Sequence, residues 1–266
     1  MTAHPKVTLV TCKSMPNLFK GEEGLLDELA ARGCDPQIKV WNDPDVDWSE
    51  AGMVVVRSVS DYASDRPAFL EWTKQLRRVQ NSADVLNWNT DKHYLKELAA
   101  LGMPTIPTNW LEPEQNLSKH QIHTRFPAFG EFVVKPAVSS GVRDIGRYTT
   151  VDTRQRQAAM RQVQGLLGEG RSVMIQRYVE EIDLHGEISL VFFNGLVSHA
   201  VEKRSALHPA SVSDAAVHEA VVTAEAADSV AWKWGEEIRR VLHGYVRSRL
   251  GHDEQFLFNR VDLVPD

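Results

Sequence analysis

The chain has 266 residues, of which 42% are hydrophobic and 25% are charged, a balance typical of a globular protein with a substantial core. This composition excludes a disordered or a collagen-like chain. The formal net charge of -6 and the scattered positions of the basic residues argue against nucleic acid as the main partner.

The first part of the chain, residues 1–90, alternates strand and helix patterns. Apolar and β-branched runs predict strands over residues 7–10, 38–41, 53–57 and 85–88, and amphipathic patterns predict helices over residues 22–32 and 67–79. This alternation predicts a small, doubly wound α/β unit with a parallel sheet. Arg57 and Ser58 stand at the end of the third strand, where open α/β sheets bind ligands, so we expect them in a pocket for the acceptor substrate.

Residues 91–177 combine helices with antiparallel strands. Asn89, Thr90 and Asp91 offer N-cap oxygens for a helix over residues 92–101, which Gly102 closes. Residues 103–108 contain two prolines and are expected to be extended. The pattern further predicts strands over residues 131–136, 147–150 and 173–178, a small-residue loop over 137–146 and a polar helix over 153–167. This region is expected to be a compact α+β lid.

Residues 178–266 begin with an acidic loop and a hairpin. The strands predicted over residues 187–193 and 196–201 flank Asn194-Gly195, a strong hairpin turn signal. A mobile loop is expected over residues 205–216, and a helix with apolar positions from Ile238 to Leu250 is closed by Gly251. A last buried strand is predicted over residues 256–264.

Lysine, serine and glycine residues mark the end of the strand over 131–136 and the loop after it. Lys135 lies in the strand, and Ser139, Ser140 and Gly141 follow in the loop. Backbone amides and hydroxyls at such a hairpin tip can bind polyphosphate, while the lysine supplies positive charge. Neither GxxxxGK[ST] nor GxGxxG occurs in the chain. Taken alone, the loop also fits an ordinary glycine-containing hairpin.

Other polar residues recur at element ends in a fixed order: Lys92, Lys135, residues 176–179, Lys203 and the run Arg260-Val-Asp262. In this order they resemble the ATP-grasp superfamily, nearest to its D-alanine–D-alanine ligase and glutathione synthetase-like carboxylate ligases and to the cyclo-ligases of cycloserine biosynthesis. The resemblance covers nearly the whole chain. It implies an α/β and α+β ATP-grasp fold with an N-terminal doubly wound, Rossmann-like pre-ATP-grasp domain.

The resemblance also implies three domains along the chain. Residues 1–90 would form the pre-ATP-grasp domain, residues 91–177 the ATP-grasp lid subdomain and residues 178–266 the C-terminal subdomain. Relatives usually continue past the Arg-x-Asp strand to a second metal-binding strand, whereas this sequence stops at Asp266. We therefore expect either a truncated sequence or a metal site that lacks its last strand.

The resemblance implies that two lysines, Lys92 and Lys135, contact the phosphates of ATP. The loop over residues 138–146, with Ser139, Ser140 and Gly141, would be the flexible lid over them. A web of dispersed cations suits phosphoryl transfer, because the charge of its transition state must be neutralised.

Three further residues would serve the terminal phosphate and the metal. Lys203 matches a lysine that reaches the terminal phosphate, Asp262 matches the Mg²⁺ ligand, and Arg260 steadies the phosphorylated intermediate. Mg²⁺ prefers oxygen ligands and retains water, so one or two carboxylates with ATP oxygens are sufficient.

The adenine and ribose would be bound by the segment that joins the two lobes. The side chain of Gln176 would face the adenine edge, together with backbone groups of Arg177 and Val179. Either Asp183 or Glu187 would hold the ribose hydroxyls, and the local sequence leaves that choice open.

Together these roles imply an ATP-dependent ligase that joins a carboxylate to an amine or related nucleophile through an acylphosphate and releases ADP and phosphate. Its cofactors would be ATP and Mg²⁺, and its substrates amino-acid-like carboxylates and amines. The product would be an amide, a peptide bond or a ring. The alternative is an ATP-binding protein of the same fold without ligase activity, and a third interpretation is an α/β scaffold that binds no nucleotide.

Each of the singled-out residues also has a plainer interpretation. Lys92 and Lys203 also fit solvated element ends, Gln176 an edge polar residue, and Arg260 with Asp262 a structural ion pair. The seven tryptophans are expected to pack in the core, His120 and His123 are not expected to form a metal pair, and Cys12 is expected to be an inert thiol.

The location and the partners follow from what the sequence lacks. Two cysteines are too few for a disulfide framework or a four-thiolate zinc site, which favours a reducing cytoplasm. The sequence has no apolar run of about 18 residues and no secretory signal pattern, so no membrane partner is expected. Many proteins of the resembling family are homodimers, and this oligomeric state is implied here as well.

Overall fold

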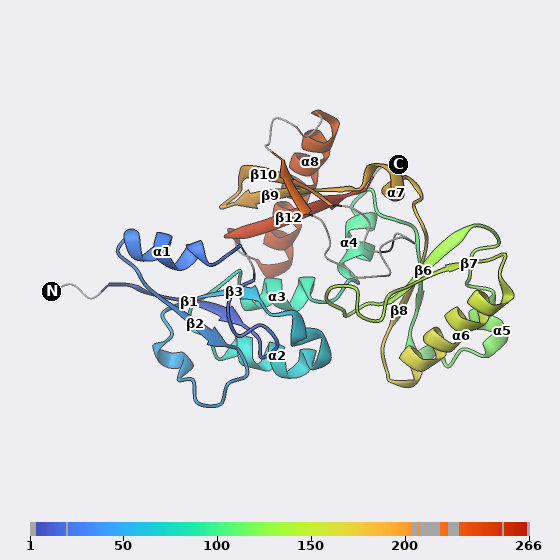
Figure 1. Cartoon of the computed structure of the whole chain (residues 1–266), viewed down its shortest axis with the longest axis horizontal. Coiled ribbons are helices and arrows are strands. Elements are labelled where there is room, and N and C mark those ends of the chain that lie inside the picture. The colour runs from blue at the N-terminus through green and yellow to red at the C-terminus, as the bar shows by residue number, and fades with distance from the viewer. Residues whose placement is uncertain are drawn as a thin grey trace. The chain divides into compact units, whose positions relative to one another are not determined.

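The computed structural model describes residues 4–19, 21–203, 207, 219–222, 229–251 and 253–264 (Figure 1). The chain divides into two compact units, which are described separately. Unit 1 comprises Met1–Thr90 with Glu254–Leu257, and unit 2 comprises Asp91–Asp253 with Phe258–Asp266. The loop expected over residues 205–216 lies outside the described residues, except for residue 207.

Unit 1 is built on a parallel sheet with the strand order β2-β1-β3-β4. Its strands are β1 (Lys6–Thr11), β2 (Asp35–Val40), β3 (Met53–Ser58) and β4 (Val79–Gln80). Its helices are α1 (Gly24–Ala31), η1 (Trp48–Glu50), η2 (Ser60–Ser64), α2 (Arg66–Lys74) and α3 (Ala83–Asn89). Strand order and direction confirm the predicted doubly wound sheet. Buried Val10, Trp41, Val54, Phe69 and Trp72 pack together as its core, which accounts for two of the seven tryptophans.

Two predictions in unit 1 were wrong. The apolar run at residues 85–88 is helical in α3, because Ser82 caps its start by accepting a hydrogen bond from the Val85 amide. The helix expected to end at residue 79 ends at Lys74, and the fourth strand is the short β4.

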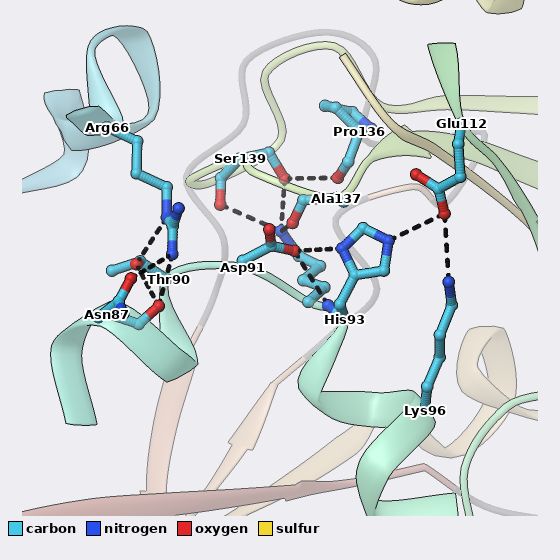
Figure 2. A network of polar contacts seen from close by, with 11 residues as sticks. Arg66, Asn87, Thr90, Asp91, His93, Lys96, Glu112, Pro136, Ala137 and Ser139 are labelled. Carbon is cyan, nitrogen blue, oxygen red and sulfur yellow. Dashed lines mark hydrogen bonds and ion pairs between the residues drawn. The ribbon is translucent and has the colours of Figure 1, made fainter. Parts of the chain in front are cut away.

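At the C-terminal end of α3, Arg66 donates to Asn87 O at 2.5 Å and to Thr90 Oγ1 at 2.9 Å (Figure 2). The Arg66 guanidinium thus donates to the carbonyl of Asn87, which lies in the last turn of α3, where backbone carbonyls have no amide of a following turn to accept from.

The first sheet of unit 2 has the strand order β5-β8-β6-β7. Its strands are β5 (Thr108–Leu111), β6 (Glu131–Pro136), β7 (Gly146–Thr149) and β8 (Val173–Arg177). The accompanying helices are α4 (Tyr94–Ala100), η3 (Pro113–Gln115), α5 (Lys119–His123) and α6 (Thr153–Gly168). Side chains alternate between the faces of a strand, so Phe132 and Val134 enter the core with α6, while Val133 and Lys135 point to the opposite face.

The expected N-cap of the helix after residue 91 was also wrong. Thr90 ends α3, and the preceding Asn89 belongs to that helix. Asp91 accepts a hydrogen bond from the amide of His93, and α4 begins at Tyr94. The side chain of Asp91 therefore orders the turn that carries Lys92, rather than capping a helix that starts there.

The second sheet of unit 2 has the strand order β11-β10-β9-β12, and all of its pairings are antiparallel. Its elements are α7 (Glu181–His185), β9 (Glu187–Phe193), β10 (Leu196–Lys203), β11 (Glu219–Val222), α8 (Ser229–Leu250) and β12 (Phe258–Leu263). Asn194 and Gly195 have φ values of 53° and 76°, as a two-residue hairpin turn requires, which confirms the predicted hairpin. Among the described residues, no helix has both the length and the apolar composition that a membrane crossing needs.

Two glycines of α8 predict opposite effects on stability. A Cβ at Gly235 would collide with Cδ1 of Leu190, which is fully buried under the helix, whereas a Cβ at Gly244 meets no atom within 4 Å. We expect Gly235→Ala to destabilise the fold by about 1–3 kcal/mol through overpacking. Gly244→Ala should stabilise it by about 0.5–1 kcal/mol, because alanine favours a helix interior. Urea unfolding of both variants measures the difference, and equal midpoints would contradict the packing of α8 on β9.

Candidate functional site

One face of the second sheet gathers the charged residues. Strand alternation and register place Glu187 opposite Lys203 and Ser189 opposite Asp262. The other face carries Leu190, Phe192, Ala200 and Val261, which form a buried cluster with residues of α8. The helix α8 packs on the apolar face, so the charged residues gather on the opposite face of the sheet.

Asp262 is the centre of this polar face. Its Oδ1 lies 2.7 Å from Arg260 Nε, and its Oδ2 accepts from Arg260 Nη2 at 2.9 Å. Ser189 Oγ donates to Oδ1 at 2.6 Å, and Lys203 Nζ lies 3.8 Å from the same oxygen. Burial acts to raise the pKa of Asp262, but the charge and hydrogen bond of Arg260, followed by Lys203 and Ser189, lower it overall. Asp262 is therefore an ionised carboxylate among cations.

Glu187 lies in the field of the same charges. Burial raises the pKa of its carboxyl, and Asp262 raises it further, against the opposing charges of Lys203, Arg260 and Lys135. The side chain of Lys203 is buried, with only 7% of its surface exposed. A buried lysine beside two carboxylates is not a solvated strand end, so the plainer interpretation of Lys203 does not hold.

Lys135 and Gln176 lie on the polar face of the first sheet. Burial lowers the pKa of Lys135, and the charge of Glu187 opposes that shift. Gln176 is buried and pairs with Thr108 and Val133 on the two neighbouring strands. Its Nε2 donates to Thr108 Oγ1 at 2.7 Å, so the amide is held in one orientation. The structure thus brings Lys135 close to Glu187 of the other sheet.

Lys92 reaches the loop that follows β6. Its Nζ donates to Ser139 Oγ at 2.7 Å, to Ser139 O at 3.2 Å and to Ala137 O at 3.3 Å. Burial and then the positive charge of Lys135 lower the pKa of Lys92 to about 8, while Asp91 opposes the shift. Lys92 and Lys135 repel each other in a partly buried site. An anionic group such as phosphate would stabilise the charged form of both lysines.

The loop after β6 is fixed at both ends. Lys92 holds Ser139 at the start, and Gln162 of α6 donates to Asp144 O at 2.7 Å near the end. The Asp144 carboxylate also accepts from Arg171 Nη1 at 2.9 Å. Between these anchors, Ser140 is half-buried, while Gly141 is exposed and has a φ of 62°. The tip of the loop can therefore present backbone amides while its ends stay in place.

The segment after β8 shows a contact that the sequence did not indicate. The Asp183 carboxylate lies 2.8 Å from Arg147 Nη1 and accepts from Tyr178 OH at 2.5 Å. Arg147 also pairs with Glu131 and stacks on the Tyr178 ring at 3.7 Å. The carboxylate of Asp183 is therefore engaged by Arg147 and Tyr178. The neighbouring Arg177 is exposed and stacks on the Phe129 ring at 4.6 Å, and Val179 is half-buried after the strand.

Two expected acceptor residues lie in unit 1. Arg57 and Ser58, at the end of β3, both contact the Glu22 carboxylate, and Ser58 Oγ also accepts from the Phe19 amide at 3.0 Å. Cys12 is buried at the end of β1, and its Sγ lies 3.2 Å from Ser14 Oγ. Burial acts to raise the pKa of Cys12, but hydrogen bonds from Ser14, Ser60 and Met15 lower it overall.

Ser189 and Tyr94 were missed in the sequence. Ser189 shares a strand face with Glu187, and this alternation could have indicated it once the register was known. For Tyr94, burial raises the pKa of the phenol and the charge of Asp262 raises it further, against Arg260. Tyr94 therefore lies near the Arg260–Asp262 pair, a proximity that no local pattern encodes.

The described residues contain no cluster of three or more histidine, cysteine or acidic side chains arranged to hold a metal. Asp262 Oδ2 accepts from Arg260 and, having two lone pairs, has room for a second ligand. One carboxylate with this capacity suits Mg²⁺, which takes its other ligands from phosphate and water.

Known proteins resemble the chain in sequence and in structure. The family described as D-cycloserine synthetase DcsG, N-terminal domain, matches residues 7–87. The cycloserine biosynthesis protein DcsG of Streptomyces lavendulae is 33% identical over 248 residues, which cover 90% of this chain and 79% of that protein. The crystal structure of D-cycloserine synthetase DcsG has 30% identity and a TM-score of 0.81, covering 97% of this chain and 86% of that one.

A more distant structure shares the fold alone. D-alanyl-alanine synthetase A from Vibrio cholerae has 15% identity and a TM-score of 0.64, and covers 98% of this chain and 85% of its own. Together, the fold and these likenesses define an ATP-grasp ligase, an ATP-using enzyme that forms carbon–nitrogen bonds. Within that class, the chain belongs to the family of D-cycloserine synthetase DcsG. The predicted ATP-grasp fold and ligase class are thereby confirmed.

Proposed function

We propose that the cations of unit 2 bind the phosphates of ATP and stabilise transfer of the terminal phosphoryl group to a substrate carboxylate. The observation that carries this proposal is the convergence of Lys135, Lys203 and Arg260 on Glu187 and Asp262, two carboxylates on one sheet face. Fixed cations in a partly buried site neutralise the charge of a transferring phosphoryl group far better than water does.

The phosphate contacts would come from three directions. Lys92 and Lys135 would contact the phosphates under the loop of Ser139, Ser140 and Gly141. Lys203 would reach the terminal phosphate, and Arg260 would steady the acylphosphate. The contacts of Lys92 with Ala137 and Ser139 support this arrangement, since incoming phosphate oxygens can replace the carbonyl oxygens that Nζ now contacts.

For the base and the ribose, we propose Gln176, the backbone of Arg177 and Val179, and Glu187. Asp183 is the weaker of the two ribose candidates, because Arg147 and Tyr178 already occupy its carboxylate. Glu187 has instead a raised pKa and neighbouring cations. The two ribose hydroxyls would donate hydrogen bonds to this carboxylate, in place of the water that burial excludes.

Asp262 is the residue that we propose to hold Mg²⁺, which when bound would neutralise charge on the phosphate oxygens. Ser189 and Arg260 orient the carboxylate for that role. Arg57 and Ser58 of unit 1 are proposed to contribute to the acceptor pocket. The three-domain division at residues 90 and 177, the homodimer and the cytoplasmic location stay predictions.

For the reaction, we propose closure of a ring in an amino-acid-like molecule. The solved structure at 30% identity is named D-cycloserine synthetase DcsG, and the relative at 33% identity is named a cycloserine biosynthesis protein. These names support an intramolecular attack of a nucleophilic nitrogen on the activated carboxylate. In outline, the terminal phosphoryl group of ATP is transferred to a carboxylate oxygen and ADP is left. The nitrogen then attacks the carbonyl carbon, phosphate leaves as the C–N bond forms, and the nitrogen loses a proton.

Product mass separates ring closure from ligation of two molecules. Purified protein is incubated with Mg²⁺, ATP and a series of amino acids that carry a second nucleophilic nitrogen, and release of ADP is measured. We expect a product equal to one substrate minus one water. A product that joins two substrates would contradict ring closure but keep the ligase, and a series without ADP release would contradict the proposed substrate class.

The lowered pKa of Lys92 predicts proton uptake when nucleotide binds. Near pH 8 the free protein holds this amine only partly protonated, and a phosphate beside it raises its pKa again. Affinity should then fall as the pH rises through about 8. Calorimetry of a non-hydrolysable ATP analogue in buffers of different ionisation enthalpy measures the uptake. Lys92→Met should abolish it, and unchanged uptake in that variant would exclude Lys92 as its source.

A further inference from the structure

A histidine with a carboxylate on each side of its ring directly follows Lys92 (Figure 2). His93 Nδ1 lies 2.6 Å from Asp91 Oδ1, and Nε2 lies 3.1 Å from Glu112 Oε1. Carboxylates accept hydrogen bonds and cannot donate them, so Asp91 and Glu112 both face the ring as acceptors.

The surroundings of His93 hold the ring in one position. The ring of Trp110 stacks on it, with the centroids 4.5 Å apart and the planes 27° apart. Lys96 Nζ lies 3.1 Å from the same Glu112 oxygen and 4.6 Å from the Trp110 centroid. The charged groups that face the ring are thus Asp91 before α4, Lys96 within α4 and Glu112 after β5.

These contacts extend to Lys92 through Asp91. The Asp91 carboxylate accepts from both the ring and the backbone amide of His93, which closes a tight turn around Lys92. On the other side of that turn, the Lys92 amide donates to Ala137 O at 3.0 Å, and Nζ donates to Ser139 Oγ. Residues 91–93 are therefore held by the segment after β5 and by the loop after β6.

We infer that His93 is a positioning residue: its ring fastens Asp91 beside Lys92 and ties the start of α4 to Glu112, which fixes Lys92 for phosphate. The inference rests on the nucleotide-binding role proposed above for Lys92. Asp91 is also the group that opposes the lowering of the Lys92 pKa. A loosened Asp91 would leave Lys92 less often protonated at a given pH.

His93→Phe tests the inference, because phenylalanine keeps an aromatic ring against Trp110 but removes both donors. Dissociation constants for a non-hydrolysable ATP analogue with Mg²⁺ are measured at about pH 6.5 and about pH 8.5, on either side of the Lys92 pKa of about 8. We expect affinity to fall by about threefold at the lower pH and by about tenfold at the higher pH. An imidazole ring carries an N–H in each of its forms, so the wild-type ring can contact Asp91 at both pH values.

A purely structural role would weaken binding equally at both pH values, and that result would overturn the inference. His123→Phe on α5 is the matched control and should bind like the wild type. If His93→Phe does not fold, Asp91→Asn provides the second test, since it keeps an acceptor oxygen for the ring but removes the charge that His93 holds beside Lys92. Its affinity loss should likewise grow with pH, and wild-type binding would overturn the inference. A wild-type protein that bound no analogue would overturn the proposed function as well.

Discussion

Lys135→Ala is expected to abolish ATP-dependent turnover, with a loss of at least about 100-fold, the effect of removing one preorganised charge contact to a transition state. Lys135 lies on the polar face of the first sheet and attracts Glu187 of the second. Without this charge, the proposed phosphate site loses the cation of the first sheet that interacts with a carboxylate of the second sheet. ADP release with a turnover-supporting amino acid measures the effect.

The unliganded variant should remain as stable as the wild type. Burial lowers the pKa of Lys135, which means that the fold opposes its charged form, so removal of the amine carries no electrostatic penalty. Lys119→Ala, at the exposed start of α5, is the matched lysine control and should turn over normally. Wild-type turnover by Lys135→Ala would refute the placement of the phosphates.

Asp262→Asn should produce the second large loss, again about 100-fold in turnover, because the amide is a poor magnesium ligand and removes one negative charge from the cation cluster. Arg260 and Lys203 would then face no counter-charge from this position. Raising the Mg²⁺ concentration should restore part of the activity if the residue holds the metal. Absence of such rescue would leave Asp262 as a structural partner of Arg260.

Stability provides an independent measure at Asp262. Its pKa is lowered in the fold, so the ionised side chain contributes stability at neutral pH, and this contribution is lost as the pH falls through the lowered folded pKa. Asp262→Asn should therefore narrow the gap in melting temperature between neutral and acidic pH. Asp253→Asn, an exposed partner of Arg247, is the matched control and should leave that gap unchanged.

Sequence patterns predicted most elements of the two units because their apolar periods are clear. The run Met53–Ser58 and the Asn194-Gly195 hairpin carry strong local signals. The run at residues 85–88 failed, because a short apolar segment fits a strand or a buried helix equally well. The cap supplied by Ser82 decides for the helix there. Tertiary context therefore determined what periodicity left ambiguous.

The candidate site was predictable only in part, for a related reason. Lys203, Arg260 and Asp262 were singled out by their order along the chain and by the family resemblance, and the structure brings them together on one sheet face. Partners that depend on the pairing register were not found: Ser189 reaches Asp262 only through the alignment of β9 with β12. The ion pair between Arg147 and Asp183 likewise joins residues that are far apart in the sequence. Contacts of this kind have no local sequence signature.

The most direct test of the nucleotide site is a thermal melt of the wild type and of Lys135→Ala, with and without Mg²⁺ and a non-hydrolysable ATP analogue. A ligand that binds only the native state at a hundredfold excess over Kd adds about 2.7 kcal/mol of stability. We predict a clear rise in the wild-type melting temperature that disappears in the variant. No rise in the wild type, or an equal rise in both proteins, would contradict a nucleotide site at Lys135.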